Sequence, residues 1–229
     1  MPGGRALKKK VRDLLSGPNL DLALEELCRL PAQQVINPLF TFLHHGDEKE
    51  KWAAVTAMGT IAAQLADQDM EAARIILRRL MWNLNDESGG IGWGSPEAMG
   101  EILSRHEGLA EEYAHILMSY TRQDGNYLEH EMLQRGLLWG IGRLAQVRPD
   151  LVRIAVPHLT SYLRSEDPTV RALVARIMGF LAAEEAREGL EQLTKDESEV
   201  SFWNDGRWFQ GRVKEVADAA LATLPSVAH

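Results

Sequence analysis

The sequence has little cysteine, no long apolar run and a deficit of positive charge. Cys28 is the one cysteine among 229 residues, which excludes an intramolecular disulfide and a thiolate metal cluster. No apolar run reaches the length of about 18 residues that a transmembrane helix requires, and no apolar segment follows the basic start of the chain, so we expect no secretory signal. These absences predict a cytoplasmic protein without a membrane span.

The formal net charge of −8 is distributed unevenly. The first 13 residues carry five basic and one acidic side chain, which leaves −12 for the remainder. This balance argues against general affinity for the phosphate backbone of nucleic acids. We interpret residues 1–19 as a basic helix that caps one end of the fold, with its charged side chains in solvent.

Four short stretches repeat along the chain, and each contains a glycine in an apolar helical pattern. The glycines are Gly59, Gly100, Gly142 and Gly179, so the spacings are 41, 42 and 37. A glycine inside a helix costs about 1 kcal/mol relative to alanine, so its recurrence predicts close contact between neighbouring helices. One structural unit is used four times.

The last copy, residues 167–182, is the clearest. It begins with an N-cap aspartate and a proline at the first helical position, and its apolar residues recur at helical spacing. It resembles the second helix of a HEAT repeat, in the short form also found in phycobilisome-lyase-like proteins, through Asp167, the Val170-Arg171 pair and the Met178-Gly179 pair. The other copies lack the aspartate and the valine-arginine pair.

This resemblance covers residues 20–224 and implies an all-α fold, a right-handed α-solenoid of HEAT-like helix pairs within a single domain, 1–229. Between the turn signals we expect helices near 5–16, 20–29, 32–45, 48–65, 68–84, 96–105, 108–122, 127–147, 149–164, 168–182, 184–193 and 212–224. The whole chain is also similar to small uncharacterised HEAT-like proteins of anaerobic bacteria, which carry no known activity.

One segment breaks the helical pattern near the C-terminus. Residues 199–211 predict a small β-hairpin with Asp205-Gly206 as its turn, followed by a cap helix at 212–224. The turn pairs Trp203 with Trp208 on one face and Phe202 with Phe209 on the other. Both faces pack if the hairpin is an end cap, which we favour, and otherwise one aromatic pair stays exposed.

Alignment of the four copies on their glycines brings polar and aromatic positions onto one helical face. We expect this face to be exposed, and in HEAT-like solenoids the second helices line the concave surface. Trp139 is the predicted centre, because the other copies have Thr, Glu or Arg there. The candidate binding residues on this face are Trp52, Trp93, Glu97, Glu101, Arg135, Trp139, Arg143 and Arg176.

The glycine-rich stretch from Trp82 to Ala98 precedes the second of these helices. It lacks the lysine of a nucleotide phosphate loop, and no strand precedes it, so neither a triphosphate nor a dinucleotide motif is supported. It is either a binding loop at the rim of the predicted surface, with Asp86, Glu87 and a buried Trp93, or an ordinary connection.

Catalytic and metal-binding patterns are sparse. Glu97 and Glu101 are one helical turn apart, but acidic residues near a helix N-terminus ordinarily interact with the helix dipole. The histidines show no zinc-ligand spacing, and we expect no metal and no cofactor.

The leading hypothesis is therefore a non-enzymatic scaffold that binds a protein or peptide segment through aromatic anchors and arginine pairing. An alternative is a DNA-repair enzyme that resembles the HEAT-like alkylpurine glycosylases, since groove tryptophans and Asp86 are compatible with it, although the net charge argues against it. A lyase-like cofactor or chromophore chaperone is the other alternative. The sequence leaves the oligomeric state open.

Overall fold

The computed structural model describes residues 4–85 and 92–225. Its elements, in chain order, are α1 (Gly4–Leu15), α2 (Leu20–Cys28), α3 (Ala32–Leu43), α4 (Glu48–Gln68), α5 (Met70–Leu84), α6 (Ser95–Arg105), α7 (Glu107–Ser119), α8 (Glu131–Val147), α9 (Pro149–Val152), η1 (Arg153–Ala155), α10 (Val156–Leu159), η2 (Thr160–Arg164), α11 (Pro168–Phe180), η3 (Glu184–Ala186), α12 (Arg187–Leu193), β1 (Glu199–Asn204), β2 (Arg207–Arg212) and α13 (Val213–Leu221).

Short polar side chains fix the start of several helices. Asn19, Asp47, Asp69 and Asp167 each accept a hydrogen bond from a backbone N–H in the first turn of α2, α4, α5 and α11. These bonds satisfy donors that the helix itself leaves unpaired. The predicted cap at Asp167 is confirmed, with 2.9 Å from Thr169 N to the carboxylate.

Two helix predictions differ from the structure for local reasons. The segment 149–164, predicted as one helix, is broken into α9, η1, α10 and η2, because Pro157 has no N–H to donate and its ring clashes with the preceding turn. Helix α8 begins at Glu131 rather than at 127. His130 caps this start, because its Nδ1 accepts a hydrogen bond from Met132 N at 3.2 Å. The sequence pattern gave no sign of this histidine cap.

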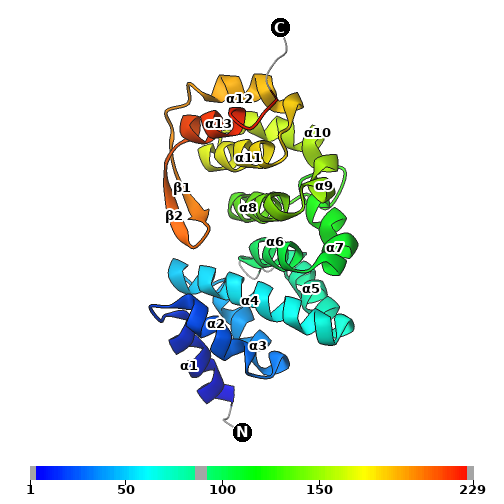
Figure 1. The fold of residues 1–229 in the computed structure, drawn as a ribbon, viewed down its shortest axis with the longest axis vertical. Coiled ribbons are helices and arrows are strands. Elements are labelled where there is room, and N and C mark those ends of the chain that lie inside the picture. Colours follow the sequence, from blue (N-terminus) through cyan, green and yellow to red (C-terminus); the bar gives the residue numbers. More distant parts are fainter. Residues whose placement is uncertain (1–3, 86–91, 226–229) are drawn as a thin grey trace. The chain divides into compact units, whose positions relative to one another are not determined.

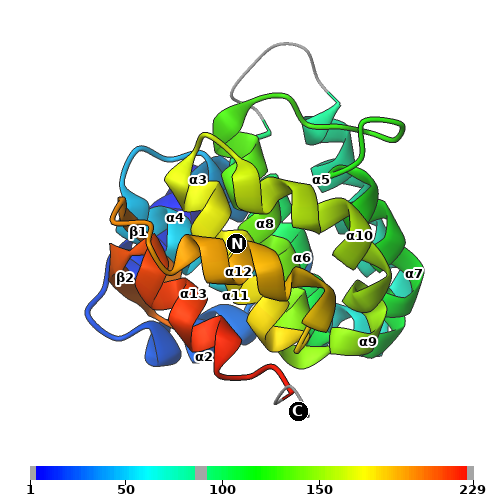
Figure 2. The same ribbon diagram turned by 90° about the horizontal axis from the view of Figure 1, so that it is seen from above.

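By their contacts, the residues divide into two units, unit 1 (1–113) and unit 2 (114–229), and α7 crosses the division. In unit 1, α4 packs against α3, α5 and α6, while α1 lies against α3 and α4, and α2 lies against α1 and α4 (Figure 1). In unit 2, α11 lies between α8 and α13 (Figure 1), and β1 packs on α11. Figure 2 shows the hairpin beside α13. The prediction of one domain over 1–229 stays a prediction.

The recurring glycines allow neighbouring helices to approach, as predicted. A Cβ on Gly59 would lie 2.5 Å from Glu101 Cγ in α6, and a Cβ on Gly179 would lie 3.0 Å from Ala220 Cα in α13. Gly142 is less constrained, because its Cβ would meet Ile177 at an ordinary 3.4 Å. The repeated motif therefore marks a packing position in each unit.

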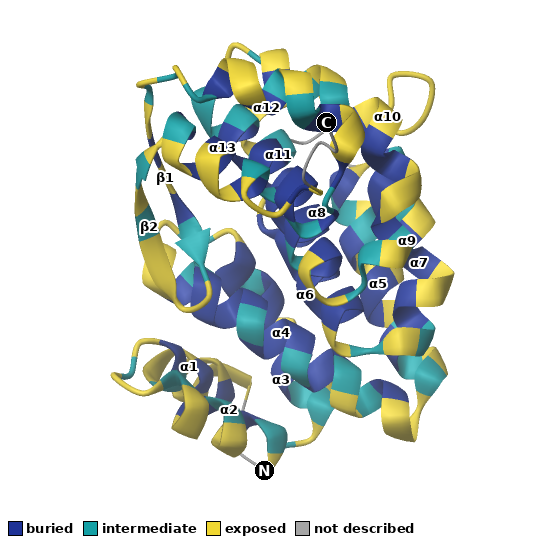
Figure 3. Ribbon diagram, turned by 45° about the horizontal axis from the view of Figure 1, so that its top comes forward, coloured by how far each residue is buried: buried dark blue, intermediate teal, exposed yellow. Residues whose placement is uncertain are grey.

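The predicted all-α solenoid with one small hairpin is confirmed. In the described part of the chain, β1 and β2 form the only sheet, antiparallel, with Phe202 opposite Phe209 and Trp203 opposite Trp208. Helices α4, α6, α8 and α11 are the most continuously buried (Figure 3). None of the described helices has the length and apolar character needed to cross a membrane.

Candidate functional site

The predicted surface in unit 1 is a buried ion-pair cluster, not an open face. Glu97 and Glu101 are buried between α4 and α6. Lys51 Nζ lies 3.1 Å from the Glu97 carboxylate, and Arg105 binds Glu101 at 2.6 Å. Burial opposes the charge on Lys51, but the carboxylates of Glu97 and Glu48 outweigh it and raise the pKa of the ammonium. The prediction that these two glutamates are exposed is wrong, because close packing at Gly59 draws α6 onto α4.

The N-terminus of α6 is closed to an external anion. Ser95 is 1% exposed and Glu97 already supplies negative charge in the first turn. Gly94 precedes the helix with φ of 75°, and a Cβ there would overlap the Leu43 carbonyl oxygen. This end of the glycine-rich stretch is therefore fixed by close packing against the end of α3.

Trp52 and Trp93, predicted to share one exposed helical face in unit 1, have different environments, and the prediction of exposure is wrong for Trp52. Trp52 is 6% exposed, and its indole N–H donates to Glu48 at 3.0 Å while Lys51 lies over its ring. Trp93 is 42% exposed, which agrees with its place in the row expected to be exposed, whereas the burial expected of it in a preformed rim loop is wrong. Asp86 and Glu87 lie outside the described residues.

In unit 2, the same helical face is covered by the hairpin. Trp139 is 6% exposed, and its indole N–H donates to the Trp203 carbonyl at 2.7 Å. Arg176 donates to Asn204 Oδ1 at 2.5 Å, and its guanidinium lies over the rings of Phe180 and Phe202. Trp139 is therefore not a solvent-exposed anchor as predicted, because a later segment of the chain packs over it.

The remaining arginines of this face are partly exposed. Arg135 binds Asp167 at 2.6 Å, and Arg143 donates to Gln146 at 3.1 Å. Both arginines are half-buried, so part of each residue is accessible to solvent. They are the accessible members of the predicted row in unit 2.

The hairpin exposes one of its two aromatic pairs, which is the alternative that we did not favour. Phe202 is buried and stacks on Phe209, with ring centroids 4.9 Å apart. On the opposite face, Trp203 and Trp208 meet edge to face at 5.9 Å, and Trp208 is 41% exposed. Alternation along the strands would have located this surface from the sequence once the hairpin turn was recognised.

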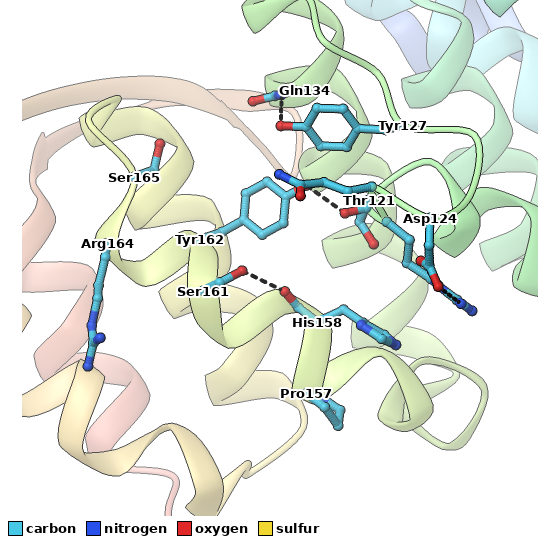
Figure 4. A pocket seen from close by; sticks show the side chains of 12 residues that line it. Thr121, Asp124, Tyr127, Gln134, Pro157, His158, Ser161, Tyr162, Arg164 and Ser165 are labelled. Carbon is cyan, nitrogen blue, oxygen red and sulfur yellow. Dashed lines mark hydrogen bonds and ion pairs between the residues drawn. The ribbon is translucent and has the colours of Figure 1, made fainter.

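Unit 2 also contains a polar cavity of about 670 Å³ that the sequence did not reveal (Figure 4). Tyr162 donates to the Thr121 carbonyl at 2.7 Å, and Gln134 donates to the Tyr127 hydroxyl at 2.8 Å. Burial raises the pKa of Tyr162, and the neighbouring Tyr127 adds to the shift, so the phenol stays neutral. The residues come from three segments without a shared motif.

Reactive groups are few in the described residues. No cluster of histidine, cysteine or acidic side chains among residues 4–85 and 92–225 has the makeup of a metal site. Burial raises the pKa of the Cys28 thiol, which disfavours the nucleophilic thiolate.

Comparison with known proteins identifies the repeat and the fold. A family model described as a HEAT-like repeat matches residues 131–181. An uncharacterized protein of Archaeoglobus fulgidus is 30% identical over 132 residues, which is 56% of this chain and 61% of the relative. The match therefore spans about three fifths of that relative's length. The relative is archaeal, whereas the sequence resemblance pointed to bacterial proteins.

Solved structures with a similar fold include designed armadillo repeat proteins. One has 19% identity and a TM-score of 0.52, covering 96% of this chain and 100% of the other. Another, solved in complex with the peptide (KR)4, has 18% identity and a TM-score of 0.53, covering 96% and 99%. At this identity the likeness establishes the repeat-solenoid fold alone.

Proposed function

We propose that this HEAT-like repeat protein is a non-enzymatic scaffold that binds an extended peptide or protein segment. Its candidate surface, the hairpin surface of unit 2, consists of Trp203 and Trp208 on one face of the hairpin and Arg207 on the other face. Arg143 of α8 is a further accessible arginine of the same unit. Trp93 is a separate accessible tryptophan in unit 1. Trp52, Glu97, Glu101 and Trp139, which are buried, would support the fold rather than touch a partner.

The observation that carries the proposal is a partly exposed tryptophan on an anchored hairpin. Trp208 is 41% exposed, while Trp139 and Arg176 bind the adjoining strand and turn. An aromatic side chain on an ordered element loses little conformational freedom on binding, and tryptophan and arginine are enriched among the residues that dominate binding energy. The likeness in fold to a designed protein solved with a bound peptide supports the same class of function.

A defined peptide library tests the proposal directly. Random peptides displayed on phage are selected on the wild-type protein, and the enriched peptides are measured by fluorescence anisotropy. Trp208→Ala is expected to weaken binding at least tenfold, as for a central interface tryptophan. Trp82→Ala is the matched control, because Trp82 in α5 is 72% exposed and lies in the other unit.

Two results would count against the scaffold. One is the absence of any peptide enriched above a control protein. The other is equal binding by the Trp208→Ala and Trp82→Ala variants, which would show that the hairpin surface contributes nothing specific.

A further inference from the structure

We propose that the outer edge of β2 accepts the partner as a third β-strand. This inference rests on the proposed function and specifies how the bound segment is recognised, through its backbone and in an extended conformation. The occupant is a segment of a protein partner with an apolar side chain opposite Trp208 and an acidic side chain next to it in sequence.

The hairpin turn determines which backbone groups point outward. Asp205 and Gly206 have φ of 47° and 84°, and Asn204 is opposite Arg207. These are the features of a two-residue type I′ turn, in which the pair next to the turn exchanges both backbone hydrogen bonds. Bonded and non-bonded pairs then alternate, so Trp203 with Trp208 and Ser201 with Gln210 direct their N–H and C=O groups away from the hairpin.

The two edges of the hairpin differ in whether their outward backbone groups are hydrogen-bonded. On β1, the outward carbonyl of Trp203 accepts from Trp139 at 2.7 Å, and this strand packs on α11. On β2, no hydrogen bond from residues 4–85 or 92–225 reaches the outward backbone groups of Trp208 and Gln210. An edge with two donors and two acceptors at strand spacing is complementary to another extended chain.

The side chains along β2 indicate the chemistry of the partner. Trp208 and Gln210 lie on one face of the strand, and Arg207 and Phe209 lie on the other. Arg207 is exposed, and no acidic group in the described part of the chain forms an ion pair with it. An added strand would present an apolar residue to Trp208 and, as its next residue, a carboxylate to Arg207.

Two proline variants test the edge with the same chemical change. Gln210→Pro removes an outward N–H from β2, and Ser201→Pro removes an outward N–H from β1. Neither N–H belongs to the ladder between the strands, and proline is tolerated at such edge positions. Circular dichroism and thermal melts confirm folding before binding of the enriched peptide is measured. We expect Gln210→Pro to weaken binding about tenfold or more and Ser201→Pro to change it less than about twofold.

A second measurement uses only the wild-type protein and therefore does not depend on the folding of a variant. Each amide of the enriched peptide is N-methylated in turn. Strand addition predicts that alternate positions lose binding, because only every second N–H faces β2.

The outcomes separate the two proposals. If Trp208→Ala weakens binding but the Gln210→Pro variant binds like wild type and N-methylation shows no alternation, the edge proposal fails and the scaffold stands. If no peptide is enriched, both fail. If sedimentation shows a dimer that Gln210→Pro dissociates, β2 pairs with a second copy, which overturns the assignment to a partner protein.

Discussion

The same helical face carries a buried tryptophan in each unit, and the two indoles have different hydrogen-bond partners. In unit 1, Trp52 is buried while its indole bonds to Glu48, one turn earlier in the same helix. In unit 2, Trp139 is buried beneath a hairpin whose contact residue is 64 positions later in the chain. The repeat register thus predicts which residues share a face, whereas the hydrogen-bond partners of those residues differ between the units.

The largest effect is expected from Trp139→Ala. This substitution removes a buried indole and leaves the Trp203 carbonyl without its donor, so we expect the free energy of unfolding to fall by about 3–5 kcal/mol. Urea denaturation followed by circular dichroism measures the loss.

Trp139→Phe is the matched variant for this position. It keeps most of the packing and loses the hydrogen bond, so a smaller loss of about 1–3 kcal/mol is expected. If Trp139→Ala is as stable as wild type, the hairpin does not cover α8 and the original prediction of an exposed anchor returns.

The next effect concerns the buried pair in unit 1. Lys51→Met leaves the buried Glu97 carboxylate without its ammonium partner, which is expected to cost about 3 kcal/mol or more. The double variant Lys51→Met with Glu97→Leu removes both charges and should recover most of that loss. Equal stabilities for the single and double variants would contradict this, because they would mean that the Glu97 carboxylate costs nothing when its ammonium partner is removed.

The recurring glycines differ from one another in how closely the neighbouring helix approaches, and this difference does not follow the division into units. Gly59→Ala and Gly179→Ala place a methyl group against Glu101 and against the Ala220 backbone, so each is expected to destabilise by about 1–3 kcal/mol. Gly142→Ala meets only ordinary contact and gains helix propensity, so it should be neutral or stabilise by up to about 1 kcal/mol. Thermal melts of the three variants check this order.

Periodicity predicted the fold well because it reports the buried face of each helix. The structure contains the predicted close contacts at Gly59 and Gly179, the cap at Asp167 and the hairpin turn at Asp205-Gly206. The site was predicted less well. A charged residue on a helical face was interpreted as exposed, but a buried ion pair places the same kind of residue inside the protein. Glu97 with Lys51 and Trp139 with the hairpin are pairings between distant segments, which a pattern within one helix does not encode.

The smallest effects come from two carboxylates, one in each unit, that join elements through hydrogen bonds. Burial opposes the charge on Asp196, but hydrogen bonds from Ser198 and Arg171 outweigh it and lower its pKa. Burial likewise opposes the charge on Glu50, and Ser16 and Arg12 lower its pKa. A lowered folded-state pKa means that the stability is present above the unfolded value, about 4, and is lost as the pH falls through the folded value.

Asp196→Asn and Glu50→Gln are therefore each expected to lower the free energy of unfolding by about 1 kcal/mol at pH 7, with a deficit that shrinks below about pH 4. Hydrogen exchange measured by mass spectrometry shows in which segments each substitution increases the rate of amide exchange. In a single cooperative domain, either variant accelerates exchange by the same factor throughout the slowly exchanging core. If Glu50→Gln instead accelerates only residues before 113 and Asp196→Asn only residues after 114, the two units unfold separately, and the prediction of one domain over 1–229 is wrong.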